Sequence, residues 1–599
     1  FDYLHHEHRR VDDAIADLRS GQRDVIENIN KLILQNNLFG VDLNEESVEI
    51  TKLSLWLKTA NKSSELTSLD GNIKFGNSLI DDPEFAGKKA FNWQKEFKNI
   101  FEDGGFDVVI GNPPYVRQEL LSPFKPYFEK NYACYHGVCD LYVYFIEKGQ
   151  KLLKENGYYG VIIANKWMRA NYGNALRDFL KEKVQLREII DFGDLPVFED
   201  ATTYPCILIY SQSQPLDKLK ASSLKELEPT RLIDTIEENK IEIEQSKLDS
   251  KGWNLGSSSE KALLEKIKSK GVPLQEYVEG KVYRGVLTGF NEAFVIDNAT
   301  RKKLIAEDPK SEEIIKPFLG GREVKRYSID WQGDYLIFAK RGIDIEKYQA
   351  VKKHLEQYRE RLEPKPKDFE GADWKGRKPG SYKWYELQDA IDYYQEFEKS
   401  KIVYPELGIQ PSFSIDRGCF YGNKTTFIIP QAENYLLCLL NSKVTHFYID
   451  KVSSVMRGGY YMFSGIYVET IPIPQISLPE QEPFILKADL MLVRNKELQT
   501  TKQKFLKLIQ SEFTIQKLSQ KLEKWNELEW VDFEKELQKA KVKLTLAQKK
   551  EWMEFFETEK KAANEIQAVI DKTDKEIDQM VYELYGLTDD EIAIVEGRS

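Results

Sequence analysis

The stretch Phe106 to Tyr115, which reads FDVVIGNPPY, constrains the fold of this chain more than any other segment. Its first half is a short, mostly apolar run rich in β-branched residues, as in a strand buried on both faces of a parallel sheet. Gly111 allows an unusual backbone path. Pro113 and Pro114 then fix φ and remove two N–H donors, and Pro113 also restricts Asn112. The sequence therefore predicts a stiff polar loop at the carboxyl end of a strand, where open α/β sheets bind their ligands.

The residues of this loop suit an aromatic amine. The exocyclic amino group of adenine is a poor nucleophile, because its lone pair is delocalised into the ring. If the Asn112 side-chain oxygen and the Pro113 carbonyl each accept one N–H, the nitrogen becomes more tetrahedral and can attack a methyl sulfonium. Carbonyl dipoles stabilise the positive charge that develops, and the Tyr115 ring would stack on the base. The alternative is a proline-capped strand end beside a buried tyrosine, since short motifs recur by chance.

Four further segments surround this motif. They are GVDLN (Gly40 to Asn44), FGNSLI (Phe75 to Ile80), GVIIANKW (Gly160 to Trp167) and VFEDATTYPCILIY (Val197 to Tyr210). In this order they resemble the motifs of adenine-N6-specific DNA methyltransferases that use S-adenosylmethionine. The whole chain is similar to the methylase and target-recognition portion of combined restriction-modification enzymes of the type IIG kind. The resemblance implies a Rossmann-like α/β methyltransferase domain, double-stranded DNA as partner, and a target base flipped into the NPPY site.

The resemblance also implies roles for individual residues. Asp42, after the second strand of the Rossmann-like order, would accept hydrogen bonds from ribose hydroxyls, unless it is only a helix-start carboxylate. Asn77, which in the alternative is a turn-forming residue, would contact the cofactor adenine together with Ile80. Phe198 would face the extruded adenine opposite Tyr115, unless it belongs to the core. The predicted catalytic residues are Asn112, Pro113, Pro114 and Tyr115, and Asn112 also counts as cofactor-binding.

With 599 residues the chain has room for two or three domains. Residues 1–211 are predicted to form a methyltransferase domain that lacks its first strand and Gly-rich turn. They would begin with a helix over residues 1 to about 35 and include an active-site loop over 116–137. A connector over 212–281, a mixed α/β target-recognition domain over 282–478 and a long-helix C-terminal region over 479–599 would follow.

The formal net charge is -11, so duplex DNA must meet a local basic face. The segment Arg361 to Tyr385 has seven basic and four acidic residues among aromatics and prolines. Such a loop can follow phosphates, although a solvated surface insertion is the alternative. The predicted DNA-binding residues are Arg322, Lys325, Arg326, Lys375, Arg377, Lys378 and Arg417.

Other classes of protein fit less well. No apolar run reaches membrane-spanning length and the first residues are no signal peptide, which indicates a cytoplasmic protein. The five cysteines include no CxxC pair. The opening cluster HHEH (His5 to His8) is interpreted as a polar helix face, so no metal is expected. No nuclease carboxylate set is evident, and an endonuclease domain, which would need Mg²⁺, is expected in a missing N-terminal region.

Three other functions remain open from the sequence. The chain would be a DNA-specificity fragment without activity of its own if the Gly-rich cofactor turn is absent. Transfer to cytosine N4 uses similar chemistry, although serine more often stands at the position of Asn112. A protein-glutamine methyltransferase would use the same motif, but it needs no extension of this length.

Overall fold

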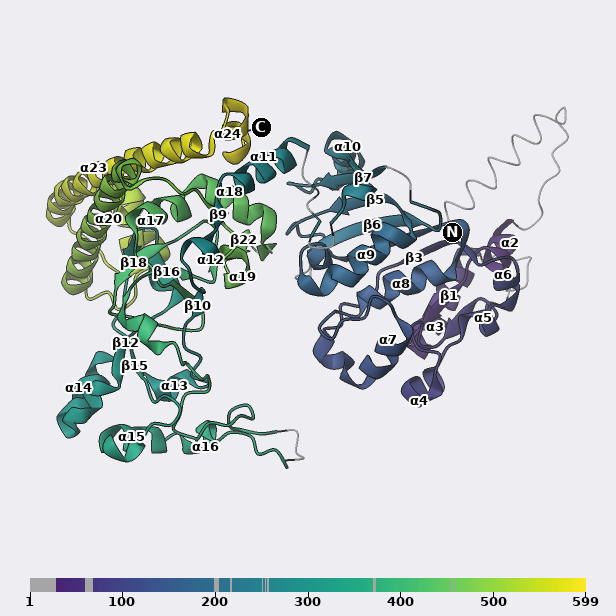
Figure 1. The fold of residues 1–599 in the computed structure, drawn as a ribbon, viewed down its shortest axis with the longest axis horizontal. Helices are drawn as coiled ribbons and strands as arrows, with labels where there is room; N and C mark the ends of the chain where they lie inside the picture. Colours follow the sequence, from purple (N-terminus) through teal and green to yellow (C-terminus); the bar gives the residue numbers. More distant parts are fainter. Residues whose placement is uncertain are drawn as a thin grey trace. The chain divides into compact units, whose positions relative to one another are not determined.

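The computed structural model describes residues 29–59, 68–198, 204–215, 218–249, 252–253, 255, 258–369, 373–453, 455–456 and 458–598 (Figure 1). The chain divides into two compact units, Phe1–Leu255 and Gly256–Ser599. Of the helix predicted over residues 1 to 35, the part up to residue 28 lies outside the described residues, as does the cluster His5 to His8. The remaining part forms α2 (Ile29–Asn36).

A six-stranded sheet forms the centre of the first unit. The strands lie in the order β3 (Phe106–Gly111), β4 (Leu153–Ala164), β6 (Pro205–Ser211), β5 (Gln185–Asp191), β7 (Lys218–Ser223) and β8 (Lys240–Glu244). The pairs β3/β4 and β5/β7 are parallel, and the other neighbours are antiparallel. The α/β class predicted for this region is confirmed.

Helices α8 (Tyr142–Leu152) and α9 (Asn174–Lys183) contribute to the core of this sheet. Val161 and Ile163 of β4 are buried, because alternate side chains of a strand point to the same face. Each fully buried aliphatic side chain here contributes roughly 1.5–3 kcal/mol to stability. The rings of Tyr159 and Tyr210 stack at 4.8 Å between centroids, and the hydroxyl of Tyr210 donates to the carbonyl of Ile146 at 2.7 Å.

A separate parallel pair, β1 (Gly40–Asp42) and β2 (Ile73–Phe75), lies beside this sheet. Helix α3 (Glu45–Thr59) follows the turn after β1, where the Asn44 side-chain oxygen caps it by accepting the Glu46 N–H at 2.8 Å. Phe39 meets Phe106 at 5.8 Å between ring centroids, which links the start of β1 to the start of β3. Short helices α4 (Pro83–Ala86), α5 (Trp93–Glu96) and α6 (Lys98–Glu102) follow β2.

The structure corrects the prediction that the strand before NPPY is buried on both faces. Val108 and Ile110 are 59% and 80% exposed. Strand β3 stands at the end of the six-stranded sheet and pairs only with β4 among the described strands. An apolar run therefore marks a strand here without showing that both of its faces are covered.

Two segments are more regular than the sequence indicated. The predicted loop over 116–137 contains the 3₁₀ helix η2 (Gln118–Phe124) and α7 (Lys125–Asn131). The predicted connector over 212–281 supplies β7, α10 (Leu232–Glu238) and β8, so the sheet continues past residue 211. Leu219 and Ala221 of β7 are buried, which shows why these polar-looking strands belong to the core.

The second unit is built from several small sheets. One antiparallel sheet has the order β10 (Tyr283–Arg284), β20 (Thr426–Ile429), β16 (Ser400–Pro405), β18 (Ser414–Arg417), and another sheet has the order β11 (Val295–Ile296), β15 (Tyr335–Ile337), β12 (Ile315–Leu319), β19 (Tyr421–Gly422). The smaller ones are β13 (Val324–Lys325) with β14 (Ser328–Ile329), β17 (Leu407–Gly408) with β22 (Tyr460–Met462) and β21 (Val455–Met456), and β9 (Val272–Pro273) with β23 (Pro472–Ile473). The helices among them are α11 (Ser258–Ser269), α12 (Leu274–Tyr277), α13 (Asn291–Phe294), α14 (Asn298–Glu307), α15 (Gln349–Glu356), α16 (Arg359–Leu362), α17 (Asn434–Asn441), α18 (Lys443–Val452) and α19 (Gly465–Val468). The predicted mixed α/β class is confirmed for this region.

Long helices complete the second unit, as predicted. They are α20 (Leu478–Phe513) and α23 (Leu546–Tyr585), with the shorter α21 (Gln520–Glu523), α22 (Trp530–Lys539) and α24 (Asp589–Val595). Capping boxes at Ser477 and Thr545 begin the two long helices, and Gly586, with φ 65°, ends α23. Between α21 and α22 lies the 3₁₀ turn at Trp525, whose ring stacks on Phe505 at 3.9 Å.

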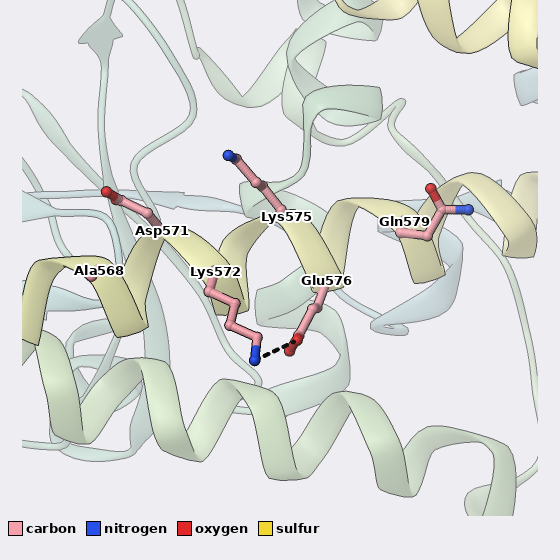
Figure 2. A pocket seen from close by; sticks show the side chains of 6 residues that line it. All are labelled: Ala568, Asp571, Lys572, Lys575, Glu576 and Gln579. Atoms are coloured by element: carbon pink, nitrogen blue, oxygen red, sulfur yellow. Dashed lines mark ion pairs between the residues drawn. The ribbon is translucent and has the colours of Figure 1, made fainter.

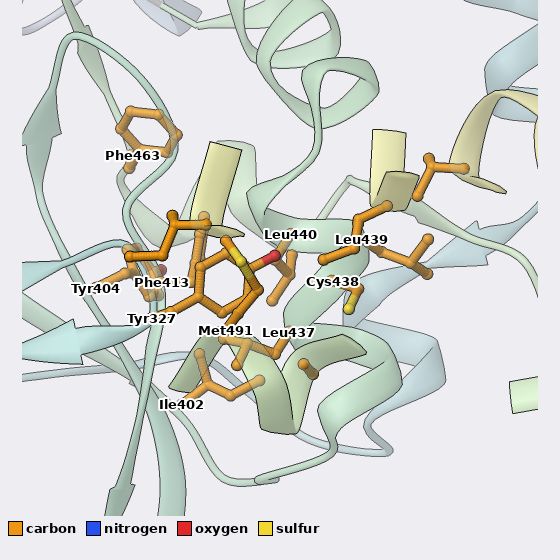
Figure 3. Packing of buried hydrophobic residues seen from close by; sticks show 14 of the residues in the cluster. Tyr327, Ile402, Tyr404, Phe413, Leu437, Cys438, Leu439, Leu440, Phe463 and Met491 are labelled. Carbon is orange, nitrogen blue, oxygen red and sulfur yellow. The ribbon is translucent and has the colours of Figure 1, made fainter. Parts of the chain in front are cut away.

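One hydrophobic core joins these helices to the small sheets. Figure 3 shows Tyr327, Ile402 and Tyr404 from the strands and turns packed with Leu437 from α17 and Met491 from α20. The core thus runs across the boundary expected at residues 478 and 479, because α20 buries its apolar side against the recognition region. The amino-acid composition changes at this boundary, but the hydrophobic core is continuous across it.

Candidate active site

The NPPY loop leaves β3 at its carboxyl end, as predicted. Pro113 is buried and Asn112 is exposed. The Val116 N–H donates to the Pro114 carbonyl at 2.9 Å, and the Leu141 N–H donates to the Val116 carbonyl at 3.2 Å. The loop is therefore tied to the beginning of α8, and the Asn112 amide stands at an accessible position at the end of the strand.

Tyr115 and Phe198 lie next to one another, although they follow different strands. Their ring centroids are 6.5 Å apart with 69° between the planes, an edge-to-face contact. The Tyr115 hydroxyl is buried and has no hydrogen-bond partner among the described residues. Burial raises the pKa of Tyr115 to about 12, with a smaller contribution from Cys206, so the phenol stays neutral at physiological pH. The two rings are neighbours, but they are not parallel as a base sandwich requires.

Asp42 and Asn77 lie at the carboxyl ends of the neighbouring parallel strands β1 and β2. The Gly76 N–H donates to the Asp42 carbonyl at 2.9 Å, which joins the two turns. One carboxylate oxygen of Asp42 accepts the Asn44 N–H at 2.7 Å, and the Asn77 side-chain oxygen accepts the Leu79 N–H at 3.0 Å. Asp42 is nonetheless exposed. Its predicted ligand role and its helix-start role are therefore compatible.

Ile80, predicted to contact the cofactor, has a buried side chain. It is 1% exposed and belongs to the core cluster of the unit. Its N–H donates to the Asn77 carbonyl at 3.3 Å, which closes a turn. This side chain packs in the core next to the turn that carries Asn77, and its contact with a cofactor stays a prediction.

The sequence interpretation missed a polar lock at the ends of β4 and β5. The Asn165 side-chain N–H donates to a carboxylate oxygen of Asp191 at 2.8 Å, and the same oxygen accepts the Gly193 N–H at 3.0 Å. The Asn165 main-chain N–H donates to the Tyr204 carbonyl at 2.7 Å. This lock fixes the start of the segment that carries Phe198. The signal in the sequence was a polar residue directly after each apolar strand.

Among the predicted DNA-binding residues, Arg326 is corrected by the structure. Its guanidinium donates to both carboxylate oxygens of Asp574 on α23, at 2.8 and 2.7 Å, and to the Asn441 carbonyl at 2.7 Å. This bidentate pair ties the β13–β14 hairpin to the helical region. Arg322 and Lys325, which precede it in the chain, are exposed.

Arg377 is corrected in the same way. It is 4% exposed and its guanidinium donates to main-chain carbonyls. Direct contact with DNA is therefore excluded in this conformation. Its neighbour Lys378 is exposed, and Lys375 is 75% exposed beside Glu360, an ion pair that is worth little in water.

Arg417 is exposed at the end of β18, on a rigid support. The preceding Asp416 is buried and forms an ion pair with Lys401. Its carboxylate also accepts the Cys419 and Phe420 N–H groups at 3.0 and 3.1 Å. The turn after Arg417 is thus held in one conformation.

A surface hollow of about 500 Å³ lies along α23 (Figure 2). All of its lining residues come from that one helix: Ala568, Asp571, Lys572, Lys575, Glu576 and Gln579. Glu576 is engaged by Lys487 at 2.7 Å, and Lys572 lies 4.0 Å from it. The hollow is lined by acidic and basic side chains on the solvated face of one helix, so it is not a candidate active site.

The residues that the structure describes contain no group of three or more histidine, cysteine or acidic side chains able to hold a metal ion. Within the same residues, no helix is long and apolar enough to cross a membrane.

Three family descriptions match parts of the chain. Residues 36–198 match the Eco57I restriction-modification methylase, residues 316–473 match the TaqI-like C-terminal specificity domain, and residues 477–581 match a domain of unknown function.

The chain is also similar to individual proteins. The Type II methyltransferase M.PaeR7I of Pseudomonas aeruginosa is 26% identical over 392 residues, which cover 62% of this chain and 65% of that protein. The Type II restriction enzyme and methyltransferase RM.Eco57I of Escherichia coli is 33% identical over 199 residues, 31% of this chain and 20% of that protein. A solved structure of the Type IIL restriction-modification enzyme MmeI in complex with DNA has a TM-score of 0.56 at 15% identity and covers 97% of this chain and 69% of that one. At this identity the structural likeness concerns the fold alone.

Proposed function

We propose that the chain methylates DNA in a restriction-modification system, because residues 36–198 match the Eco57I restriction-modification methylase and residues 316–473 match the TaqI-like C-terminal specificity domain. The proposed reaction is transfer of a methyl group from S-adenosylmethionine to adenine N6 within a specific duplex sequence. The chain matches only 65% of the length of M.PaeR7I, so activity of the whole protein is part of the proposal.

The observation that carries the proposal is the accessible Asn112 beside the Tyr115–Phe198 ring pair. In the proposed mechanism the Asn112 side-chain oxygen and the Pro113 carbonyl accept the two N–H groups of the target amine. The amine lone pair then points outward and would form the new N–C bond to the methyl group as the methyl–sulfur bond of the donor breaks and its electron pair stays on sulfur. Positive charge grows on nitrogen, where the two carbonyl dipoles stabilise it more in the transition state than in the ground state. The extra proton leaves to water after transfer.

The residues at the carboxyl ends of β1 and β2 fit the cofactor in part. S-adenosylmethionine, when bound, supplies the electrophilic methyl group. Asp42 offers an exposed carboxylate that can accept hydrogen bonds from ribose hydroxyls, and Asn77 lies after the adjacent strand. The burial of Ile80 leaves it outside the proposed contacts.

The exposed basic residues of the second unit are proposed to meet DNA. Lysines such as Lys375 and Lys378 suit phosphates, because a flexible ammonium acts as a point charge. The planar guanidinium groups of Arg322 and Arg417 suit a guanine edge.

The test compares the full chain with Asn112→Ala. Tritiated methyl incorporation from S-adenosylmethionine into duplex DNA should fall by about a hundredfold or more, since one lost transition-state hydrogen bond is worth roughly 3 kcal/mol. DNA affinity should stay within about twofold. The matched control is Asn131→Ala on α7, at an exposed asparagine away from β3.

Digestion of the methylated product to nucleosides identifies the acceptor. N6-methyladenine supports the proposal, and N4-methylcytosine overturns its choice of base. If the wild-type chain binds DNA but transfers no methyl group, it is a DNA-specificity fragment. Near-normal transfer by Asn112→Ala would remove this residue from the mechanism.

A further inference from the structure

Arg377 carries a buried charge without the usual partner. Its guanidinium donates five hydrogen bonds to main-chain carbonyls: Leu362 at 2.8 Å, Thr288 at 3.0 Å, Glu386 at 2.8 Å, Lys383 at 3.2 Å and Trp384 at 2.9 Å. Among the described residues, no carboxylate accepts a hydrogen bond from it. Arg326 differs in this respect, because Asp574 neutralises it directly.

Two aromatic rings complete the environment of this guanidinium. Its central carbon lies 4.4 Å from the centroid of Tyr382 and 5.6 Å from that of Phe294. Burial lowers the pKa of Arg377 to about 10, so the group still carries its charge at neutral pH. Carbonyl dipoles and ring faces hold the cation, and this arrangement needs the planar five-donor fork that only arginine has.

The carbonyls belong to segments that are distant in sequence. Thr288 lies in the turn before α13, Leu362 ends α16, and the other acceptors lie between residues 383 and 386. The Tyr382 hydroxyl donates to the Lys378 carbonyl, and the Lys383 N–H donates to the Glu386 carboxylate at 2.8 Å. The chain from 377 to 386 is therefore folded around the guanidinium.

Three lysines on this folded segment or next to it are exposed. Lys375 and Lys378 flank Arg377, and Lys383 follows Tyr382. The guanidinium of Arg359 lies 5.0 Å from the Trp384 ring centroid and is paired with Glu363 at 3.1 Å, so it adds little net charge to this region. Cations on a fixed main-chain path can match the regular spacing of phosphates better than cations on a flexible loop, because less conformational entropy is lost on binding.

We propose that Arg377 is a positioning residue for DNA binding: it fixes the main chain so that Lys375, Lys378 and Lys383 meet phosphates together. The inference rests on the proposed function, since it requires that the chain binds DNA. It replaces the direct DNA contact predicted for Arg377 with an indirect role in which the guanidinium itself touches no nucleotide.

The test measures the affinity of the full chain for a duplex over a range of salt concentrations. Arg377→Lys keeps the charge but loses the fork, so we expect the slope of log affinity against log salt to fall in magnitude by about two or more, as several lysines lose their positions. Lys378→Ala is the reference for one phosphate contact and should lower the slope by about one. Arg301→Lys on α14, which pairs with Glu312, is the matched control and should retain the wild-type slope.

Hydrogen exchange gives a second readout. Peptides covering residues 375–388 should exchange faster in Arg377→Lys, while those of α14 remain unchanged. Tyr382→Phe is a milder variant that removes only the hydroxyl that donates to the Lys378 carbonyl. The slope of its log affinity against log salt should lie between those of wild type and Arg377→Lys. If Arg377→Lys does not fold, Tyr382→Phe decides the question.

A wild-type slope in Arg377→Lys, or in Tyr382→Phe where only that variant folds, overturns the positioning role. Failure of the proposed function looks different: the wild-type chain would then show no salt-dependent affinity for DNA. Loss of slope in Lys378→Ala together with a normal slope in Arg377→Lys also overturns the inference, because lysines would then contact phosphates without this support.

Discussion

The rings of Tyr115 and Phe198 meet edge to face, 6.5 Å apart, where the loops after β3 and β5 approach each other. A flat base that stacks on both rings needs them nearly parallel, whereas their planes are inclined by 69°. If a base stacks between the two rings, as proposed, one ring must therefore turn. Phe198 is the ring expected to turn, because Tyr115 lies in a loop that is tied to α8 through Val116.

Tyr115→Phe should leave methyl transfer within about twofold of wild type. The buried hydroxyl has no partner among the described residues, so its removal should be neutral or should stabilise the fold by up to about 1 kcal/mol. Tyr115→Ala and Phe198→Ala should each slow single-turnover methylation by about tenfold or more, because stacking is worth roughly 1–3 kcal/mol per base. A strong defect in Tyr115→Phe would show that the hydroxyl, and not the ring face, acts in the reaction.

Asp42→Ala should weaken binding of S-adenosylmethionine about tenfold or more without changing duplex affinity. Hydrogen bonds to a charged acceptor are worth roughly 1.5–3 kcal/mol, and contacts to ribose are made in ground and transition states alike. Calorimetry on the full chain measures the effect, with Glu129→Ala on α7 as an exposed acidic control. An unchanged dissociation constant would leave Asp42 with its turn at Asn44 alone.

Arg322→Ala or Arg417→Ala should make the free energy of binding to the recognition site less favourable by roughly 1–3 kcal/mol, and the loss should concern one base position, because a guanidinium fork reads the edge of guanine. Arg326→Ala should instead lower the free energy of unfolding, because the half-buried carboxylate of Asp574 loses its ion-pair partner. Affinities for every single-base variant of the recognition site at fixed salt, together with melting temperatures, separate the two classes. Equal losses across all site variants for both Arg322→Ala and Arg417→Ala would refute base reading by these residues.

Asp578→Asn should raise stability at neutral pH. Burial and the neighbouring Asp574 raise the pKa of Asp578 to about 6, so the folded chain binds a proton that the unfolded chain releases near pH 4. Stability of the wild type should therefore fall as pH rises from about 4 to 6 and level off above 6. The raised pKa corresponds to a loss of roughly 2–3 kcal/mol in the free energy of unfolding between pH 4 and neutral pH.

Urea unfolding of the second unit between pH 4.5 and 7.5 measures this dependence. Asp578→Asn can still accept the Lys443 N–H through its amide oxygen, so the hydrogen bond is retained. Glu557→Gln, at an exposed site of α23, is the control. A pH profile that is the same in Asp578→Asn and wild type would assign the dependence to other groups.

The sequence by itself determined the features that depend on neighbouring residues. The strand that stops at Asn112 and the helix capped by Asn44 follow from local backbone chemistry, because proline geometry and capping act within a few residues. The two long helices follow from composition over many turns. The strand before the NPPY loop and the long-helix region over 479–599 lie close to their predicted positions.

Only the tertiary structure decided the roles of the basic residues and the extent of the first sheet. Arg377 has the same local sequence character as a DNA-contacting arginine, but its acceptors at Thr288 and Leu362 are distant in sequence. Arg326 likewise meets Asp574 through an ion pair across 248 positions. Strand β7 joined the sheet because β5 offered it a parallel edge. A charged side chain is buried only where folding brings hydrogen-bond or ion-pair partners to it. Because these partners are distant in sequence, the residues next to the charge do not predict its burial.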